Sequence, residues 1–267
     1  MSVITLLTDF GVDDEYVGIM KGVILSLNPA ATIVDITHSI DPQDLIQAAY
    51  MVESYFKYFP KGTVHVIVVD PGVGSDRAIL AFESKGHIFL APDNGVLTLL
   101  FDKKNTGKIV RVDNFDYFLE FVGNTFHGRD IFAPVCAHLS MGLDISRMGA
   151  PLDQKDLVRL DIPRPFISNK NDLSGVIVSI DRFGNLITNI DLSIMEAFCR
   201  TAKVEKTEII IGKKSIRGLS AKYDDVKPQK PLAVIGSRGY LEIAVNCGSA
   251  REYFSAKKGN IIKVILC

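Results

Sequence analysis

The sequence predicts an α/β domain with a mostly parallel sheet sandwiched by helices, followed by an all-β barrel domain. Strand-like and helical patterns alternate in the first half of the chain, whereas short apolar segments separated by turns follow one another in the second. The length of 267 residues also favours two hydrophobic cores over one. We therefore expect an α/β domain over residues 1–160 and a barrel over 161–267, with the boundary inside 142–172.

The first half alternates strands and helices as a series of βαβ units does. The expected strands are Val3–Leu7, Thr32–Ile36, Val64–Val69, Ile79–Glu83, His87–Leu90 and Lys108–Val112, and the expected helices are Tyr16–Leu27, Pro42–Tyr58 and Ile131–Met141. The turn at Asp93-Asn94-Gly95 is expected to cap a further helix. A short connection at residues 84–86 predicts a hairpin. This alternation favours a sheet with helices on both faces.

Residues 142–171 separate the two halves, because their prolines interrupt any long element. After them the pattern becomes one of short β segments. These are Gly175–Ile180, Leu186–Ile190, Glu208–Ile211, Ser215–Leu219, Pro231–Ile235, Leu241–Val245 and Ile261–Leu266. Turn residues such as Gly212-Lys213 and Gly236-Ser237 divide them, which is typical of a small antiparallel barrel or sandwich.

Composition excludes several classes of function. The chain has 30 basic and 31 acidic residues, no basic run and no Trp, which argues against nucleic acid or an anionic membrane as partner and favours a small neutral or zwitterionic ligand. The four cysteines form no CxxC pair, so we expect buried or terminal thiols and no zinc or redox motif. A charged N-terminal segment and the lack of a ~20-residue apolar run predict a cytoplasmic protein.

The first polar cluster is TDFGVDDEY, which places Asp9 at the end of the first strand. Asp13 or Asp14 is expected to cap the following helix. A carboxylate at the position of Asp9 can accept both hydroxyls of a ribose, as acidic residues do in other nucleotide sites. A metal site is the rival interpretation, but the carboxylates lack the alternate spacing around a glycine that hard-ion loops show.

The second cluster is VVDPGVGSDR, in which Asp70 follows a strongly apolar strand and a Pro-Gly-x-Gly turn leads to Arg77. Glycines permit a tight turn whose backbone amides face a ligand. The motif lacks the third glycine of a dinucleotide site and the Lys-Ser/Thr of a phosphate loop. A structural Asp70–Arg77 salt bridge at a hairpin corner is the alternative.

The third cluster, GNTFHGRD, places His127 between turn-forming residues and directly before a helix. Most histidines are satisfied polar residues, and we expect that of His38, His65, His87 and His138. His127 differs because Arg129 and Asp130 follow it and because its turn precedes a helix. It is therefore the candidate catalytic histidine.

Two further clusters lie in the second half. DRFGNLITNI offers Asp181, Phe183 and Asn185 around a glycine turn, and an Asn amide with an aromatic ring can recognise a purine nucleoside. SRGYLEIAVNCGSARE gathers polar residues on one hairpin, namely Ser237, Arg238, Tyr240, Glu242 and Asn246. An ordinary β-turn and an exposed hairpin tip are the structural alternatives.

Taken in order, these five motifs and the run DITHSIDP over residues 35–42 resemble the S-adenosyl-L-methionine (SAM) hydroxide adenosyltransferases, relatives of the bacterial fluorinases and chlorinases. The resemblance spans essentially the whole chain. It implies an α/β N-terminal domain, a C-terminal β-barrel, and a homotrimer. In that trimer, active sites lie between the N-terminal domain of one subunit and the C-terminal domain of its neighbour.

The resemblance also implies roles for individual residues. Asp70, Arg77 and His127 match the set associated with water activation, and Asp9 matches the carboxylate that binds the ribose. The remaining expected substrate-binding residues match positions that hold the methionine end or the adenine. They are Asp181, Asn185, Ser237, Arg238, Glu242 and Val245.

The chain departs from the halogenating relatives in an informative way. It has His127-Gly128 where those enzymes carry a Tyr followed by Ser or Gly, and Asp70-Pro71 where they have Tyr-Pro. The long fluorinase insertion before the His127 motif is also absent. Gly128 alone would still admit chloride, since chlorinases resemble this chain there. A carboxylate at position 70 would repel an anionic nucleophile and favour one that must lose a proton.

We therefore expect an enzyme that hydrolyses SAM to adenosine and L-methionine by in-line attack of water on the ribose C5′. It is expected to need neither cofactor nor metal. A chlorinase making 5′-chloro-5′-deoxyadenosine and a non-catalytic adenosine-binding protein are the alternatives, and a metal-dependent hydrolase is disfavoured.

Overall fold

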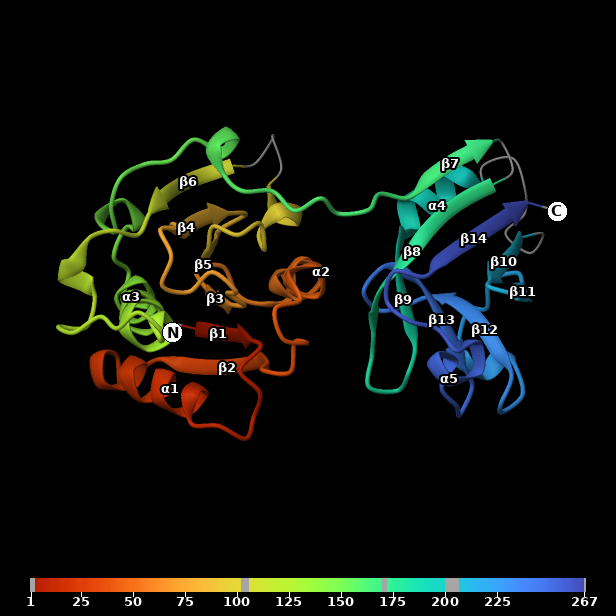
Figure 1. The fold of residues 1–267 in the computed structure, drawn as a ribbon, viewed down its shortest axis with the longest axis horizontal. Coiled ribbons are helices and arrows are strands. Elements are labelled where there is room, and N and C mark those ends of the chain that lie inside the picture. Colours follow the sequence, from red (N-terminus) through yellow and green to blue (C-terminus); the bar gives the residue numbers. More distant parts are fainter. Residues whose placement is uncertain (1–2, 102–105, 170–171, 200–206, 267) are drawn as a thin grey trace. The chain divides into compact units, whose positions relative to one another are not determined.

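A computed structural model of the protein describes residues 3–101, 106–169, 172–199 and 207–266 (Figure 1). The chain divides into two compact units, Met1–Leu160 and Asp161–Cys267. The first unit holds two buried apolar clusters, one on each face of a sheet, and the second unit holds a cluster of its own. Each unit thus has the buried core that a domain requires.

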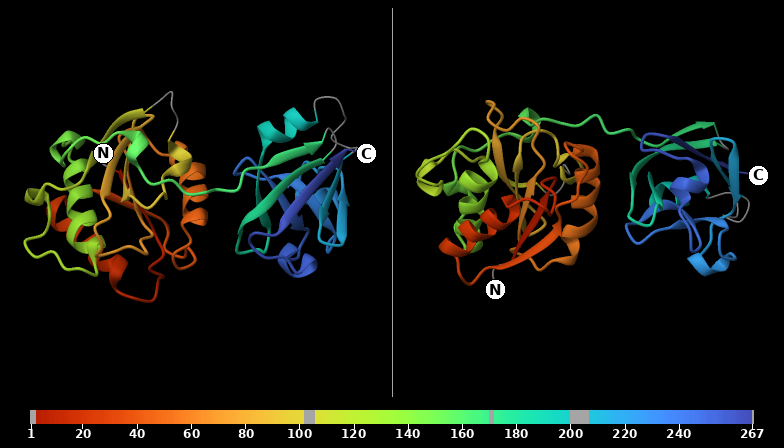
Figure 2. Two further views of the ribbon diagram at one scale, coloured as in Figure 1. Left: turned by 45° about the horizontal axis from the view of Figure 1, so that its top comes forward. Right: turned by 60° about the horizontal axis from the view of Figure 1, so that its bottom comes forward.

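The first unit is built on a six-stranded sheet in the order β2-β1-β3-β5-β4-β6 (Figures 1 and 2). The strands are β1 (Val3–Thr8), β2 (Thr32–Thr37), β3 (Val64–Val68), β4 (Ile79–Ser84), β5 (His87–Pro92) and β6 (Thr106–Arg111). β1 pairs in parallel with β2 and β3, and β3 with β5, whereas β4 pairs antiparallel with β5 and β6. The expected mostly parallel sheet and its hairpin are confirmed.

Helices cover both faces of this sheet. α1 (Tyr16–Leu27) and α3 (Ala133–Ser140) pack against each other and against one face, and α2 (Leu45–Tyr55) packs against the other. Neighbouring residues of a strand point to opposite faces, so Leu6 joins the first core and Leu7 the second.

Two expected helices differ from the structure. The Asp93-Asn94-Gly95 turn caps no α-helix, because the Asn94 side chain donates to the Val69 carbonyl at 2.8 Å and only a 3-10 turn, η2 (Thr98–Leu100), follows. α2 begins at Leu45, where Asp44 accepts from the Gln47 backbone N–H, and ends in η1 (Phe56–Tyr58). Other short turns are η3 (Phe115–Tyr117), η5 (Ile145–Arg147) and η6 (Gln154–Asp156).

The second unit is an eight-stranded, wholly antiparallel sheet in the order β11-β10-β14-β8-β9-β13-β12, with β7 paired to β8 (Figure 1). Its strands are β7 (Phe166–Asn169), β8 (Asp172–Ile180), β9 (Leu186–Asp191), β10 (Thr207–Ile211), β11 (Lys214–Arg217), β12 (Pro231–Ile235), β13 (Tyr240–Val245) and β14 (Ile261–Leu266). β11 and β12 also contact each other, so the sheet is nearly closed. The expected barrel is confirmed.

Some elements of the second unit were not expected. They are β7, α4 (Leu192–Phe198), α5 (Ala250–Phe254) and η8 (Tyr223–Asp225). Cys136 and Cys199 are buried as expected, and Cys267 lies outside the described residues. The prediction was wrong for Cys247, which is exposed because it lies in the turn after β13 with φ +53°. Among the helices that the structure describes, none has both the length and the apolar character needed to cross a membrane.

Candidate active site

The first candidate pocket lies where β1 and β3 end. These strands are parallel neighbours, so their carboxyl ends meet at one edge of the sheet, where open α/β sheets bind ligands. The loops that follow them enclose a hollow of about 240 Å³ together with the segment around His127. It is lined by Asp9, Phe10, Tyr16, Val68, Asp70, Val73, Thr125, Phe126, His127 and Gly128.

Asp70 and Arg77 form a buried ion pair beside this pocket. The Arg77 Nε donates to both carboxylate oxygens at 2.9 and 2.8 Å, and its Nη2 donates to Oδ2. The side chains are 5% and 10% exposed, respectively, so water screens the pair little. The salt bridge that was the structural alternative for this motif is therefore present, and its Asp70 lines a pocket.

The turn after Asp70 brings the His127 segment to this pair. Gly74 has φ +80°, and a Cβ there would lie 2.4 Å from the Asn124 carbonyl oxygen, so only glycine allows the two loops to touch. The Nη2 of Arg77 then lies 3.0 Å from His127 Nδ1. Arg77 thus bridges the carboxylate and the imidazole.

This contact determines the tautomer of His127. A guanidinium has donors only, so Nδ1 accepts and a neutral ring carries its proton on Nε2. Burial first, and then the charge of Arg77, lower the pKa of His127, while a hydrogen bond to the Gly123 backbone raises it. The lowered pKa favours the neutral imidazole, which accepts from Arg77 at Nδ1.

Asp130 holds the segment before His127 in place, a role that the sequence did not reveal. Its carboxylate is fully buried and accepts from the Gly123 N–H at 2.9 Å and from Arg129 Nε at 2.6 Å. Residues 128–132 form a π-helical turn, η4 (Gly128–Phe132), which departs from the helix expected from Ile131. Because the backbone of Gly123 also acts on His127, Asp130 supports the imidazole indirectly.

An aromatic wall forms the apolar side of the pocket. The ring centroids of Phe10 and Phe126 lie 6.0 Å apart, and Tyr16 lies 5.8 Å from Phe10 and 5.1 Å from Phe126. A Cβ at Gly128 would lie 3.0 Å from the Phe126 ring and 3.2 Å from the Met20 sulfur, so these rings close tightly over the glycine. Such a wall suits a flat or apolar ligand group.

Asp9 lines the same pocket, and its Oδ2 accepts from the Gln43 backbone N–H at 2.9 Å. Neither Asp13 nor Asp14 caps α1, because the N-cap residue is Glu15 and its side chain makes no capping bond. The prediction of an aspartate cap was wrong, since the turn after Gly11 carries both side chains into solvent.

The second candidate pocket lies in the barrel unit and has a volume of about 520 Å³. It is lined by Asp181, Phe183, Asn185, Ile187, Tyr223, Ser237, Arg238, Glu242, Val245, Asn246, Cys247 and Gly248. All the substrate-binding residues expected in this unit therefore meet at one hollow, although they come from two distant stretches of sequence.

Asp181 organises one rim of the second pocket. Its Oδ1 accepts from the backbone N–H groups of Phe183 and Asn185, and its Oδ2 accepts from the Asn185 side chain at 3.0 Å. With its Nδ2 bound in this way, Asn185 keeps its amide oxygen as an acceptor. The Phe183 ring is 77% exposed and available for stacking.

Glu242 and Tyr223 form the opposite part of the second pocket. The Tyr223 hydroxyl donates to Glu242 Oε1 at 2.6 Å. Burial raises the pKa of Glu242, and Asp181 adds to this, whereas Tyr223 and Arg238 oppose it. Sequence reasoning selected Glu242 but not Tyr223, which lies nineteen residues earlier on η8.

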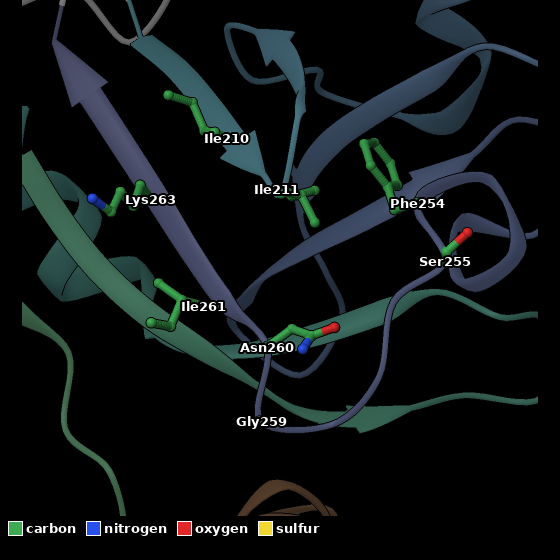
Figure 3. Close-up of a pocket in the computed structure, with 9 residues that line it drawn as sticks. Ile210, Ile211, Phe254, Ser255, Gly259, Asn260, Ile261 and Lys263 are labelled. Atoms are coloured by element: carbon green, nitrogen blue, oxygen red, sulfur yellow. The ribbon is translucent and has the colours of Figure 1, made fainter.

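A further hollow of about 570 Å³ lies on the barrel beside β10 and β14 (Figure 3). Among the residues described around it, Lys263 carries a charge and the others are apolar or small polar residues such as Ile211, Phe254 and Asn260. It offers no pair of groups for acid–base chemistry. Within the described residues there is also no group of three His, Cys, Asp or Glu side chains that could hold a metal ion.

Fold and pockets together define a class of two-domain protein, with an Asp–Arg–His network at the edge of an α/β sheet and a polar pocket on a β-barrel. The N-terminal domain model of the SAM hydroxide adenosyltransferases matches residues 4–149, and the C-terminal domain model matches residues 175–263. The chain belongs to the SAM hydroxide adenosyltransferase family.

Named relatives support this assignment, and a solved structure has the same fold. An (R)-S-adenosyl-L-methionine hydrolase of Thermus thermophilus is 33% identical and covers 99% of this chain and 100% of its own. A fluorinase of an Actinoplanes species is 28% identical and covers 98% and 97%. The crystal structure of an uncharacterised conserved protein from Thermotoga maritima superposes with a TM-score of 0.91 at 36% identity, covering 98% of this chain and 99% of its own.

Proposed function

We propose that this protein hydrolyses SAM to adenosine and L-methionine by in-line attack of water on the ribose C5′. This proposal rests on the buried Asp70–Arg77–His127 network, which lies beside a pocket whose carboxylate and aromatic lining suits a nucleoside. The activity named for the Thermus relative, which aligns over the whole chain, supports it.

The substrate itself determines what the protein must supply. A sulfonium leaves as a neutral thioether, so the reaction needs no general acid. Water has to be held in line with the C5′–S bond, and positioning of this kind contributes roughly 7–11 kcal/mol. In our proposal Asp9 binds the ribose hydroxyls, the aromatic wall excludes bulk water, and the second pocket binds the remainder of the substrate.

The proton of the attacking water goes to Asp70 in this mechanism. The C5′–O bond forms as the C5′–S bond breaks with its electron pair on sulfur, and one water proton passes to the carboxylate. Although Arg77 binds both oxygens, a carboxylate offers about four acceptor sites and keeps capacity for water. His127 is not free to accept, because Arg77 occupies Nδ1. Its part is to orient Arg77.

Halogenation of SAM is the second candidate function, because the fluorinase relatives align over nearly the whole chain. Arg77 is a potential anion ligand, but its guanidinium already binds Asp70 through two nitrogens. The Asp70 carboxylate would repel a halide at close range. We therefore favour water as the nucleophile.

The assembly and location of the enzyme are further parts of this proposal. By resemblance to the family we propose a homotrimer with active sites shared between subunits, a cytoplasmic location and no cofactor requirement. Sedimentation equilibrium tests the assembly: a mass three times the 29.4 kDa chain supports the trimer, and a monomer contradicts it.

A product assay tests the function. Chelator-treated protein is incubated with SAM in the absence and presence of chloride or fluoride, and the nucleosides are separated by chromatography. We expect adenosine and methionine in equal amounts, unaffected by halide or chelator. A 5′-halogenated nucleoside would support the second candidate, and unchanged SAM with tightly bound adenosine would indicate a binding protein.

A further inference from the structure

Glu242 is a buried carboxylate that lines the second pocket and is held in place by its neighbours. It lies on β13 between Val234 of β12 and Ile187 of β9, and it is only 8% exposed. Its Oε1 accepts from the Tyr223 hydroxyl at 2.6 Å. On its other side, a Cβ at Gly236 would lie 2.4 Å from Oε2, so the backbone packs directly against that oxygen. The side chain has little freedom to turn away.

Tyr223 is itself held by a well-anchored segment. η8 lies between β11 and β12, and the N–H of Ser220 donates to the Ala233 carbonyl at 2.8 Å. After η8, the Asn246 side chain donates to the Val226 carbonyl at 2.7 Å. The hydroxyl therefore reaches Glu242 from a loop fixed on both sides to the strands that flank the pocket.

The charges around Glu242 are unbalanced. Asp181 and Arg238 are the charged groups that act on it, with opposite effects, and the described hydrogen bond of Arg238 goes to Ser179 at 3.4 Å. Two carboxylates thus share one guanidinium around this pocket. Such a site favours a ligand that brings a positive charge of its own.

We propose that Tyr223 is a positioning residue that fixes Glu242 as an anion, and that this pair makes the site prefer cationic SAM to the neutral product adenosine. The inference rests on the proposed function. SAM carries a sulfonium, an ammonium and a carboxylate group and is therefore a net cation, whereas adenosine carries no charge. The pair therefore strengthens substrate binding without equally retaining the nucleoside after the C5′–S bond has broken.

Affinities for the two ligands test this. Tyr223→Phe removes one hydroxyl from a half-exposed side chain, and Glu242→Gln removes the charge while keeping the shape. Tyr253→Phe, on an exposed tyrosine of α5, is the matched control. If the protein turns over SAM, KM and the inhibition constant of adenosine are measured; if it does not, calorimetry gives both affinities directly. A protein that binds SAM without hydrolysing it would disprove the proposed function, while the two affinities would still test the role of the Tyr223–Glu242 pair.

We expect both variants to bind SAM about tenfold more weakly, the usual effect of losing one charge-assisted hydrogen bond, and adenosine within about twofold of wild type. Because the Tyr223 bond lowers the pKa of Glu242, Tyr223→Phe should also move the acid limb of kcat/KM to higher pH. Equal weakening of both ligands, or no change in either, would overturn the proposal.

Discussion

The two pockets differ in how their polar groups are held. In the first, Asp70, Arg77 and His127 are locked into one buried network, and a fully buried Asp130 supports the loop beneath them. In the second, Asp181 and Glu242 are held by separate sets of hydrogen bonds, and the wider hollow is rimmed by exposed side chains such as Phe183. Chemistry needs fixed geometry, whereas recognition tolerates a more open surface. The difference assigns catalysis to the first pocket and recognition to the second in our proposal.

The largest effect is expected for Asp70→Asn in the first pocket. Asparagine keeps the shape but cannot accept the water proton, so kcat should fall by about 10²–10⁴-fold with KM nearly unchanged. Asp76→Asn, on an exposed residue of the same turn, is the control. Steady-state kinetics and circular dichroism separate lost chemistry from lost folding. Turnover within tenfold of wild type would exclude Asp70 as the proton acceptor.

Acid should lower the stability of the first unit through its histidines, because all five histidines of the chain lie in that unit. Burial lowers the pKa of His65 to about 3, and His87 beside it is lowered as well. The unfolded chain therefore binds more protons than the folded one below pH 6.5, and stability falls as the pH drops from 6.5 towards 3.

By pH 4 we expect His65 alone to reduce the free energy of unfolding by about 3 kcal/mol. Urea titrations at pH 7 and pH 4 measure this loss. His65→Gln keeps polar contacts to Thr5 but does not titrate, so its stability should depend less on pH than that of wild type. An equal pH dependence of both proteins would contradict the assignment.

Asp130→Asn should weaken the support of the first pocket. Asparagine turns a donor towards Arg129, and we expect the free energy of unfolding to fall by about 1–3 kcal/mol and kcat to fall while adenosine affinity is kept. Arg129 is 41% exposed and can regain water, which limits the loss. Urea unfolding and kinetics test this against the exposed Asp14→Asn. Full activity would show that the loop needs no such anchor.

The smallest effect is expected at the open rim of the second pocket. Phe183→Ala removes an exposed ring, so KM should rise by about threefold to tenfold, the value of one stacking contact, with kcat and stability unchanged. Phe121→Ala, on an 81% exposed ring outside both pocket linings, should change neither constant. A fall in kcat alone for Phe183→Ala would contradict the assignment of recognition to the second pocket.

Elements that are mainly apolar and flanked by polar or turn residues could be predicted from the sequence. The helix Tyr16–Leu27 and the strand Pro231–Ile235 have the expected bounds, because Glu15 and Asn28 flank the first and Lys230 and Gly236 flank the second. The Asp93-Asn94-Gly95 turn was predicted wrongly, since Asn94 bonds to Val69 across the fold instead of capping a helix. Local sequence cannot show such a partner.

The same limit applies to the site. Asp70, Arg77 and His127 stood out because strand ends and glycine turns mark positions where polar groups converge. The supporting residues did not. Asp130 acts by accepting a hydrogen bond from the Gly123 N–H, and Tyr223 reaches Glu242 only when the barrel brings η8 beside β13. Contacts of this kind depend on tertiary packing rather than on any motif.

Turnover in ¹⁸O-water tests the central claim most directly. The protein is incubated with SAM in labelled water, and the nucleoside and the methionine are analysed by mass spectrometry. Our account predicts one ¹⁸O atom at the 5′ position of adenosine and none in methionine, because water attacks C5′ and the C5′–S bond breaks. Label in methionine, or an adenosine without label, would contradict it.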